Sequence, residues 1–213
     1  MRGNLKRIAG AGALTAAAAG LYAFVIRPWH LRWGATDEEV AMTLPGDEFV
    51  PEPDLNATHA ITINAPVSAV WPWLVQIGQD RGGFYSYAWL ENLVGCHMKN
   101  ASSVLAQFQE LSVGDEIWLH PKAPPLHVLR VEKEKYIVLE KCWSFILHAI
   151  DDNTTRLIIR GRGNFEQPDL GNAVLNFIYW RLIFEPAHFV MERKMMLNLK
   201  ELAETGTSDE QNT

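Results

Sequence analysis

Closely spaced strand patterns in the second half of the chain restrict its fold more than any other feature. Their residues alternate between apolar and polar types or are rich in β-branched and aromatic residues, which is typical of strands. Short turns such as Asp151-Asp152-Asn153 separate them. Because a parallel crossover needs a dozen or more residues, neighbours this close must pair antiparallel. The predicted strands span residues 116–120, 126–131, 136–141, 143–150 and 155–163.

Patterns before and after these strands complete a mixed order of elements. Residues 58–63 alternate and are β-branched, which predicts a first strand. Apolar residues at helical spacing predict short helices over 67–77 and 85–94, and a helical region over 170–203 closes the chain. We therefore predict an α+β domain over residues 58–204, in which a curved antiparallel sheet wraps around a long C-terminal helix. A cavity lies between them if the facing side chains leave space.

An uncharged run from Ile8 to Ile26 is the clearest local signal. Its nineteen residues would extend about 28 Å as a helix, close to the roughly 30 Å of a hydrocarbon core. Trp29 and Trp33 follow where an interfacial aromatic belt would lie. We therefore predict that residues 1–27 form an N-terminal transmembrane helix that anchors the protein to a membrane by a single span.

Other interpretations of this run stay open. Basic residues before it and the small residues Ala16-Ala17-Ala18 also suit a cleaved secretory signal peptide. A soluble helix is the third possibility. The positive charge before the run weakly favours a cytoplasmic N-terminus, but Arg27 and Arg32 act in the opposite direction. The orientation in the membrane is therefore left open.

Polar segments flank the predicted domain. Residues 28–57 hold four prolines and scattered acidic residues, which prevent long regular elements, so we predict an extended connector. Within it, Thr36 precedes three acidic residues and could cap one short helical turn. Residues 205–213 form a polar tail that we predict to be disordered.

Charge and motifs exclude several classes of protein. The net charge of −6 provides no basic field, so we expect no nucleic-acid partner. The chain lacks a Gly-x-Ser-x-Gly elbow, a Walker loop, a dinucleotide fingerprint and Cys/His zinc spacing, so we expect neither a metal nor a cofactor. Cys96 and Cys142 are compatible with one disulfide or with two buried thiols.

Three stretches of the predicted domain carry a family resemblance. They are Ala60-Ile61-Thr62-Ile63-Asn64-Ala65-Pro66 with Val70-Trp71-Pro72-Trp73-Leu74, then Gly78-Gln79-Asp80-Arg81-Gly82-Gly83-Phe84-Tyr85-Ser86-Tyr87, then Phe184-Glu185-Pro186-Ala187-His188-Phe189-Val190-Met191. The first resembles the START/polyketide-cyclase (SRPBCC) superfamily in general, and the others look like an uncharacterised bacterial membrane-anchored subgroup of it. The resemblance covers about residues 58–204 and implies a helix-grip fold with a hydrophobic pocket. It implies no single reaction, because members include lipid carriers, cyclases, hormone receptors and stress proteins.

Large rings with polar ends are the first candidates for a cavity wall. Residues 80–87, which contain paired glycines, form either a lid over the pocket or a tight loop that packs rings into the core. Trp118 and His120 share a strand face that either lines the cavity or faces outward. The aromatic and imidazole candidates are Tyr85, Tyr87, Trp89, Trp118, His120, Trp143 and Phe145.

Charged candidates lie on the last predicted strand and on the long helix. Arg160 is one of three arginines on one strand face, which either holds an anionic head group or is solvated. Glu185, His188 and Glu192 lie within about 60° of one another around the helix, beside Met195 of the predicted core stripe. Glu-x-x-His is half of a di-iron pattern, but a second copy is absent from the sequence. A polar cavity wall and a surface row of ion pairs are the other interpretations.

The nearly apolar stretch 173–184 is too short and too interrupted for a membrane span. It is either the buried start of the long helix or a segment in the membrane interface.

These features predict a membrane-anchored domain that binds a hydrophobic or amphipathic small molecule, lipid-like, quinone-like or polyketide-like, in an internal cavity. One alternative is a cyclase or dehydratase that acts on such a ligand through tyrosine, histidine or carboxylate groups. Another is a membrane-proximal interaction module whose cavity is filled by its own side chains. A large cavity favours binding, convergent polar groups with shifted pKa values favour catalysis, and a filled interior favours the module. The sequence leaves protein partners undetermined.

Overall fold

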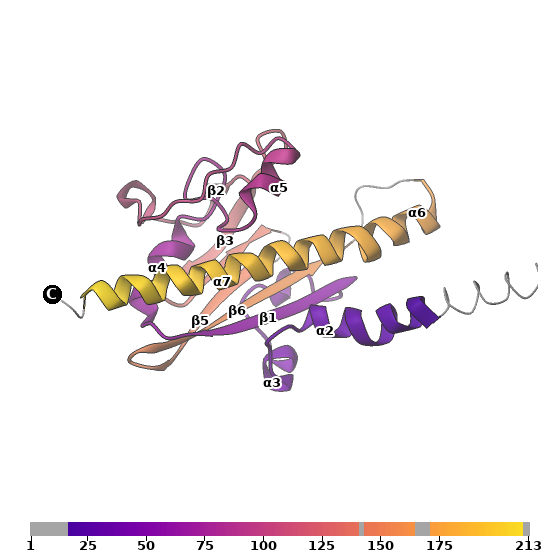
Figure 1. The fold of residues 1–213 in the computed structure, drawn as a ribbon, viewed down its shortest axis with the longest axis horizontal. Helices are drawn as coiled ribbons and strands as arrows, with labels where there is room; N and C mark the ends of the chain where they lie inside the picture. The colour runs from indigo at the N-terminus through magenta and orange to yellow at the C-terminus, as the bar shows by residue number, and fades with distance from the viewer. Residues whose placement is uncertain (1–16, 141–142, 165–170, 211–213) are drawn as a thin grey trace, which may run out of the picture.

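The computed structural model describes residues 17–140, 143–164 and 171–210. They form an α+β fold around a six-stranded antiparallel sheet in the order β1-β6-β5-β4-β3-β2 (Figure 1). The predicted class and the antiparallel, hairpin-connected sheet are thus confirmed. The strands are β1 (Leu55–Ile63), β2 (Glu116–Ile117), β3 (Leu126–Glu132), β4 (Tyr136–Leu139), β5 (Trp143–Asp151) and β6 (Thr154–Gly163).

The pairing of the first strand with the last positions the rest of the fold. β1 and β6 pair over their whole length, from Leu55 opposite Gly163 to Ile63 opposite Thr155. Because side chains alternate along a strand, this register puts His59 and Ile159 on the inner face and Ala60 and Ile158 on the outer face.

Helix α7 (Glu185–Glu210) crosses the inner face of the sheet (Figure 1). Its buried Met195, Met196 and Leu199 belong to one apolar cluster with Leu157 and Ile159 of β6. α4 (Val67–Val75) joins the same cluster from the side. Full burial of each such side chain contributes roughly 1.5–3 kcal/mol, so this stripe fixes α7 against the sheet.

The C-terminal helical region is longer than predicted. α6 (Ala173–Phe177) and η5 (Ile178–Phe184) continue into α7 without a break, so helix extends from residue 173 to residue 210. The predicted disorder from residue 205 is therefore wrong up to residue 210, and residues 211–213 lie outside the described ranges. The Thr205 hydroxyl donates to the carbonyl of Glu201 at 2.7 Å, which satisfies this polar side chain within the helix.

Residues 17–31 form a second continuous helix, which includes η1 (Tyr22–Ile26) and α2 (Arg27–Leu31). Residues 8–16 of the predicted transmembrane anchor lie outside the described ranges. No helix in the described part of the chain combines the length and the apolar character that a membrane crossing requires.

The predicted extended connector over residues 28–57 is instead folded, with α2 packed beside α7 and residues 35–49 on the outer face of the sheet. It contains α2, α3 (Asp37–Ala41) and η2 (Asp47–Phe49), and its Leu44 packs with Ala60, Ile146 and Ile158. As predicted, Thr36 caps a short helix: its hydroxyl accepts from the Glu39 amide at 3.2 Å, and the Glu39 carboxylate accepts from the Thr36 amide at 2.8 Å. Part of the outer face is apolar, and covering it removes that surface from water.

Arginines of β6 hold this connector in place. Arg160 is buried and its guanidinium lies 2.7 Å from the Asp47 carboxylate, while Arg156 lies 2.7 Å from Glu39. Arg160 also donates to the backbone carbonyls of Glu39, Val40 and Met42. The prediction that Arg160 lines the inner cavity is therefore wrong, because even-numbered residues of β6 point away from α7. A solvated arginine face is wrong as well.

Replacement of Arg160 by alanine tests this arrangement. The variant removes the buried partner of Asp47 and the bonds to three connector carbonyls, and among the described residues it leaves Asp47 with only the longer 3.2 Å ion pair to Arg162. The free energy of unfolding should therefore fall by about 3 kcal/mol. Arg130→Ala is the matched control, because Arg130 and its partner Glu48 are both largely exposed, and it should cost less than about 1 kcal/mol. Urea unfolding of the full chain in detergent measures both. Equal losses for the two variants would contradict the role given to Arg160.

Candidate functional site

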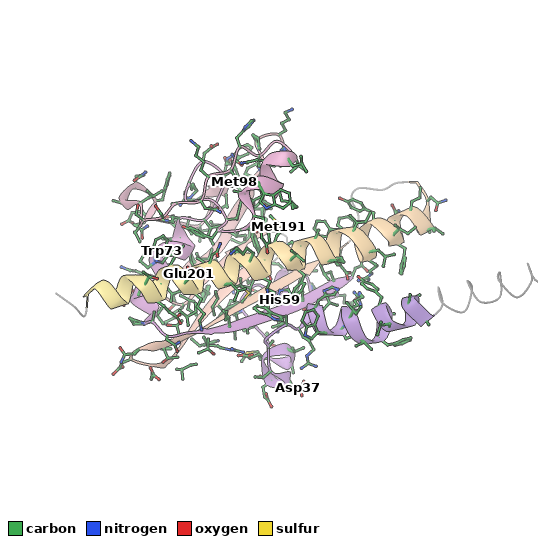
Figure 2. All side chains as sticks on the ribbon, in the orientation of Figure 1. Asp37, His59, Trp73, Met98, Met191 and Glu201 are labelled. Atoms are coloured by element: carbon green, nitrogen blue, oxygen red, sulfur yellow. The ribbon has the colours of Figure 1, made fainter. Side chains whose placement is uncertain are left out.

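A buried ion pair joins the first strand to the long helix. Strand alternation turns His59 inward from β1, and α7 presents Glu192 opposite it, with each side chain no more than 3% exposed. Figure 2 shows His59 between β1 and α7. Its Nδ1 hydrogen bonds to the Glu192 carboxylate, and its Nε2 lies 2.7 Å from the backbone carbonyl of His30. Because both ring nitrogens face acceptors, both must donate, and His59 is therefore an imidazolium.

Burial and pairing act in opposite directions on these two groups. Burial alone lowers the pKa of His59, but the Glu192 carboxylate and the His30 carbonyl raise it more, so the net pKa lies above its usual 6.5. Burial raises the pKa of Glu192, but His59, then His188 and the Trp143 indole, lower it below its usual 4.5. The Trp143 indole donates to Glu192 at 2.8 Å. Opposite charges at contact distance thus keep both groups ionised inside the protein.

The pH range in which the pair stabilises the fold follows from these directions. The contribution of His59 is complete below pH 6.5 and is lost as the pH rises through its raised pKa. The contribution of Glu192 is complete above pH 4.5 and is lost as the pH falls through its lowered pKa. Both contributions are therefore complete between pH 4.5 and 6.5.

Beside this pair lies a small hollow, here called the His30 hollow. Its volume is about 10 Å³, close to the space that one water molecule needs. His30 is 2% exposed, and within the described structure neither of its ring nitrogens has a hydrogen-bond partner. Burial lowers the pKa of His30, against a smaller opposing effect of Glu185, so this imidazole is neutral at pH 7. The hollow is lined by His30, Leu31, Leu55, Ala57, His59, Glu185, His188 and Phe189.

Two helical segments, residues 17–31 and 173–184, are here called the helix pair and meet beside the His30 hollow. Figure 1 shows that both project beyond the same end of the sheet. The side chain of Glu185 is fully buried at their base, where it bonds to Arg27 at 2.8 Å and to Arg181. The Tyr22 hydroxyl donates to the backbone carbonyl of Arg181. Charge pairing and this hydrogen bond therefore tie the two segments together.

The projecting part of the helix pair is apolar on nearly all sides. Residues 17–26 and 171–180 contain no Asp, Glu, Lys or Arg. Most of their side chains are exposed, including Phe24 at 83% and Phe177 at 60%. A helix that is apolar all round belongs in a protein core or in a membrane. The other exposed large apolar side chains of the pair are Leu21, Val25, Ile26, Trp29, Val174, Leu175, Ile178, Leu182 and Ile183.

Several predicted cavity residues lie in the packed interior. Phe145 and Met195 are buried in the cluster between the sheet and α7, with Trp143 against it. Tyr85 is 1% exposed and accepts a hydrogen bond from the Gln76 amide at 2.6 Å, and burial raises its pKa to about 12. Of the two interpretations of residues 80–87, the structure therefore favours the tight loop that packs rings into the core.

Other predicted residues lie at the periphery. Trp89, on α5 (Ala88–Leu93), is 67% exposed and Trp118 is 37% exposed. His120 accepts from the Lys122 amide through Nδ1 and donates from Nε2 to the Val94 carbonyl at 3.1 Å. Tyr87 is half-buried against Lys194. These four residues do not line the interior of the sheet-and-helix layer.

Side chains fill most of the space between the sheet and its helices. A second hollow, also about 10 Å³, is lined by Leu74, Val75, Ile77, Leu111, Ile117, Ile137, Leu139 and Phe145. Neither hollow approaches the roughly 300–1,000 Å³ of a typical ligand pocket. The described side chains thus do not form the wide internal cavity that the family resemblance implies.

The structure changes the interpretation of the acidic residues on α7. Glu185 and Glu192 are buried, so the predicted surface row of ion pairs is wrong, and Glu192 faces the sheet instead of lying at the margin of the core stripe. Among the described residues, no three His, Cys, Asp or Glu side chains are arranged to hold a metal ion. Cys96 is buried as a free thiol, and Cys142 lies outside the described ranges.

His30 and His59 were not among the sequence candidates. A signal for His59 was present, since a histidine at an inward position of a β-branched strand needs a polar partner. Its partner, Glu192, is 133 residues away in the chain, and the pairing of β1 with β6 decides that they meet. His30 carried no such signal, because it lies in the segment that the sequence predicts to be extended.

Comparisons with known proteins add little to this description. No protein-family model and no curated protein matches the chain. A matching solved structure is a conserved protein of unknown function from Enterococcus faecalis. It has a TM-score of 0.33 and 15% identity, and the match covers 72% of this chain and 85% of that chain. Neither a fold nor a function follows from a likeness at this level.

Replacement of Glu192 by glutamine tests the buried ion pair. Without the carboxylate, burial dominates, so the pKa of His59 should fall below 6.5 and the free energy of unfolding should drop by about 3–5 kcal/mol. NMR titration of the histidine imidazoles and urea unfolding measure the two effects. Glu201→Gln, on the exposed side of α7, is the control and should change neither. A His59 pKa that stays raised in Glu192→Gln would show that another group holds its proton.

Proposed function

We propose that this protein is a membrane-anchored helix-grip domain of the SRPBCC type that binds a hydrophobic or amphipathic small molecule. The observation that carries the proposal is the position of the His30 hollow at the base of the helix pair. A hollow with an unpaired buried imidazole adjoins the base of two helical segments whose projecting parts are exposed and apolar. Such a neighbourhood suits a ligand with one polar end and an apolar remainder.

The helix pair supports the membrane part of this proposal. The uncharged run that begins at Ile8 continues through the exposed apolar residues up to Ile26. The second segment, residues 173–184, adds apolar side chains at its side. In water this surface would carry a continuing free-energy cost of roughly 25 cal/mol for each Å² of apolar area. A lipid bilayer removes that cost, and the domain is then held with the His30 hollow close to the lipid.

The filled interior moves the proposed ligand site away from the middle of the sheet. Phe189 packs against both His30 and His59, and its ring centroid lies 5.4 Å from each of their rings. Rotation of Phe189 and separation of α2 from α7 would enlarge the His30 hollow without disturbing the main core. The ligand would therefore enter at the end of the domain where the helix pair projects.

Native mass spectrometry of the full chain with lipids extracted from its host tests binding. The protein should carry apolar adducts, and Ala57→Leu should lose most of them, because the added side chain fills the His30 hollow. Such overpacking costs roughly 1–3 kcal/mol, which a folded protein of ordinary stability tolerates. Ala149→Leu, at an exposed position of β5, is the matched control and should retain the adducts. Adducts that persist in Ala57→Leu would place the ligand elsewhere.

A membrane-proximal interaction module is the second candidate function. The two small hollows favour it, because side chains occupy the space that a ligand carrier keeps open. If the protein is folded and membrane-bound but carries no adduct from the lipid extract, that result would support the interaction module and oppose the ligand-binding function.

Cyclase or dehydratase chemistry stays a prediction of the sequence. Both ring nitrogens of His59 and both carboxylate oxygens of Glu192 are engaged by protein groups. These two residues therefore present no free atom to a substrate, and their arrangement suits a structural ion pair.

A further inference from the structure

We propose that the His30 hollow receives the hydroxyl group of a long-chain, uncharged amphipathic molecule drawn from the membrane. This inference rests on the proposed function and adds to it the chemical class of the ligand and the residue that recognises it. α2, which supplies His30, lies before residues 58–204, so the recognising residue stands outside the part of the chain that the family resemblance covers.

The buried imidazole of His30 lacks a hydrogen-bond partner among the described residues. A buried polar group without a hydrogen bond costs roughly 1–3 kcal/mol, and both ring nitrogens of His30 are in this state within the described structure. The other buried polar side chains of the wall are already engaged, Glu185 by Arg27 and Arg181, and His59 by Glu192 and the His30 carbonyl. Among the buried polar side chains of the described wall, His30 is therefore the one with hydrogen-bonding capacity left for a ligand, while the partly exposed His188 can bond to water.

A hydroxyl is the polar group that best fits the imidazole and the size of the hollow. A neutral imidazole has one nitrogen that donates and one that accepts. A hydroxyl group both donates and accepts, so it can pair with whichever ring nitrogen it meets. The hollow of about 10 Å³ has room for about one oxygen atom. A phosphate, a sulfate or a sugar is too large without extensive rearrangement.

Charge at the hollow disfavours an ionic ligand. The charged groups there already have partners within the protein, Glu185 with Arg27 and Arg181, and His59 with Glu192. A fatty-acid carboxylate would have to share the two arginines with the buried Glu185, and two carboxylates that share a site repel each other. The remaining wall is apolar, with Leu31, Leu55 and Phe189, and it adjoins the exposed apolar helix pair along which an alkyl chain can lie.

Three ligands of equal chain length test separately for the hydroxyl group, the negative charge and the alkyl chain. The full chain, labelled with ¹⁵N-histidine and held in phosphatidylcholine nanodiscs, is titrated with tetradecan-1-ol, tetradecanoate and tetradecane. The His30 imidazole signals, identified by their absence in His30→Phe, should shift with the alcohol and stay in place with the alkane and the carboxylate. An equal response to alcohol and alkane would overturn the inference and leave a bound water as the partner of His30. A stronger response to the carboxylate would overturn it too.

A variant pair supplies an independent measurement. His30→Phe should weaken binding of tetradecan-1-ol by roughly tenfold, the effect of losing one hydrogen bond in a buried site. His148→Phe, at an exposed position of β5, should bind as the unaltered protein does. If the alcohol binds with unchanged affinity to a folded His30→Phe, the hydroxyl site is wrong while ligand binding itself stands. If none of the three ligands binds to the unaltered protein, the inference and the proposed function both fail.

Discussion

The buried ion pair between His59 and Glu192 connects the three parts of the molecule on which everything else depends. It joins β1 to α7, and through the carbonyl of His30 it also fixes α2 against both. Charges of this kind are costly to bury, and their attraction offsets that cost only when the geometry satisfies their remaining hydrogen-bonding atoms. The Trp143 indole fulfils that condition on the carboxylate side. The pair therefore contributes less to net stability than to a single defined arrangement of strand and helices.

The same principle operates on the opposite face of the sheet. Arg160 and Asp47 form a buried pair there, and three backbone carbonyls of the connector accept hydrogen bonds from the terminal nitrogens of the guanidinium. A segment rich in proline and acidic residues thereby becomes an ordered layer. Each face of the sheet thus combines an apolar cluster with buried, paired charges. The apolar residues supply most of the stabilisation, and the ion pairs fix the position of the elements that cover the sheet.

The contacts on the two faces of the sheet leave two features of the molecule unsatisfied, and the proposed function rests on them. The sheet and α7 fill their shared interior, whereas the end of the molecule beside α2 retains an unpaired imidazole and an uncovered apolar surface. Both features lie at one place because Glu185, bound by Arg27 and Arg181, holds the helix pair together there. A membrane-derived molecule with a polar end would satisfy both requirements at once.

The sequence by itself determined the α+β class, the antiparallel strands and the long C-terminal helix, because these depend on local periodicity and on short connections. It also showed the uncharged run before residue 27. Only the tertiary structure decided which faces those elements bury. The inward turn of His59, the outward turn of Arg160 and the folding of the connector all depend on the pairing of β1 with β6, between segments far apart in the chain. Local pattern carries no information about that pairing, and for this reason the His30 hollow could not be predicted.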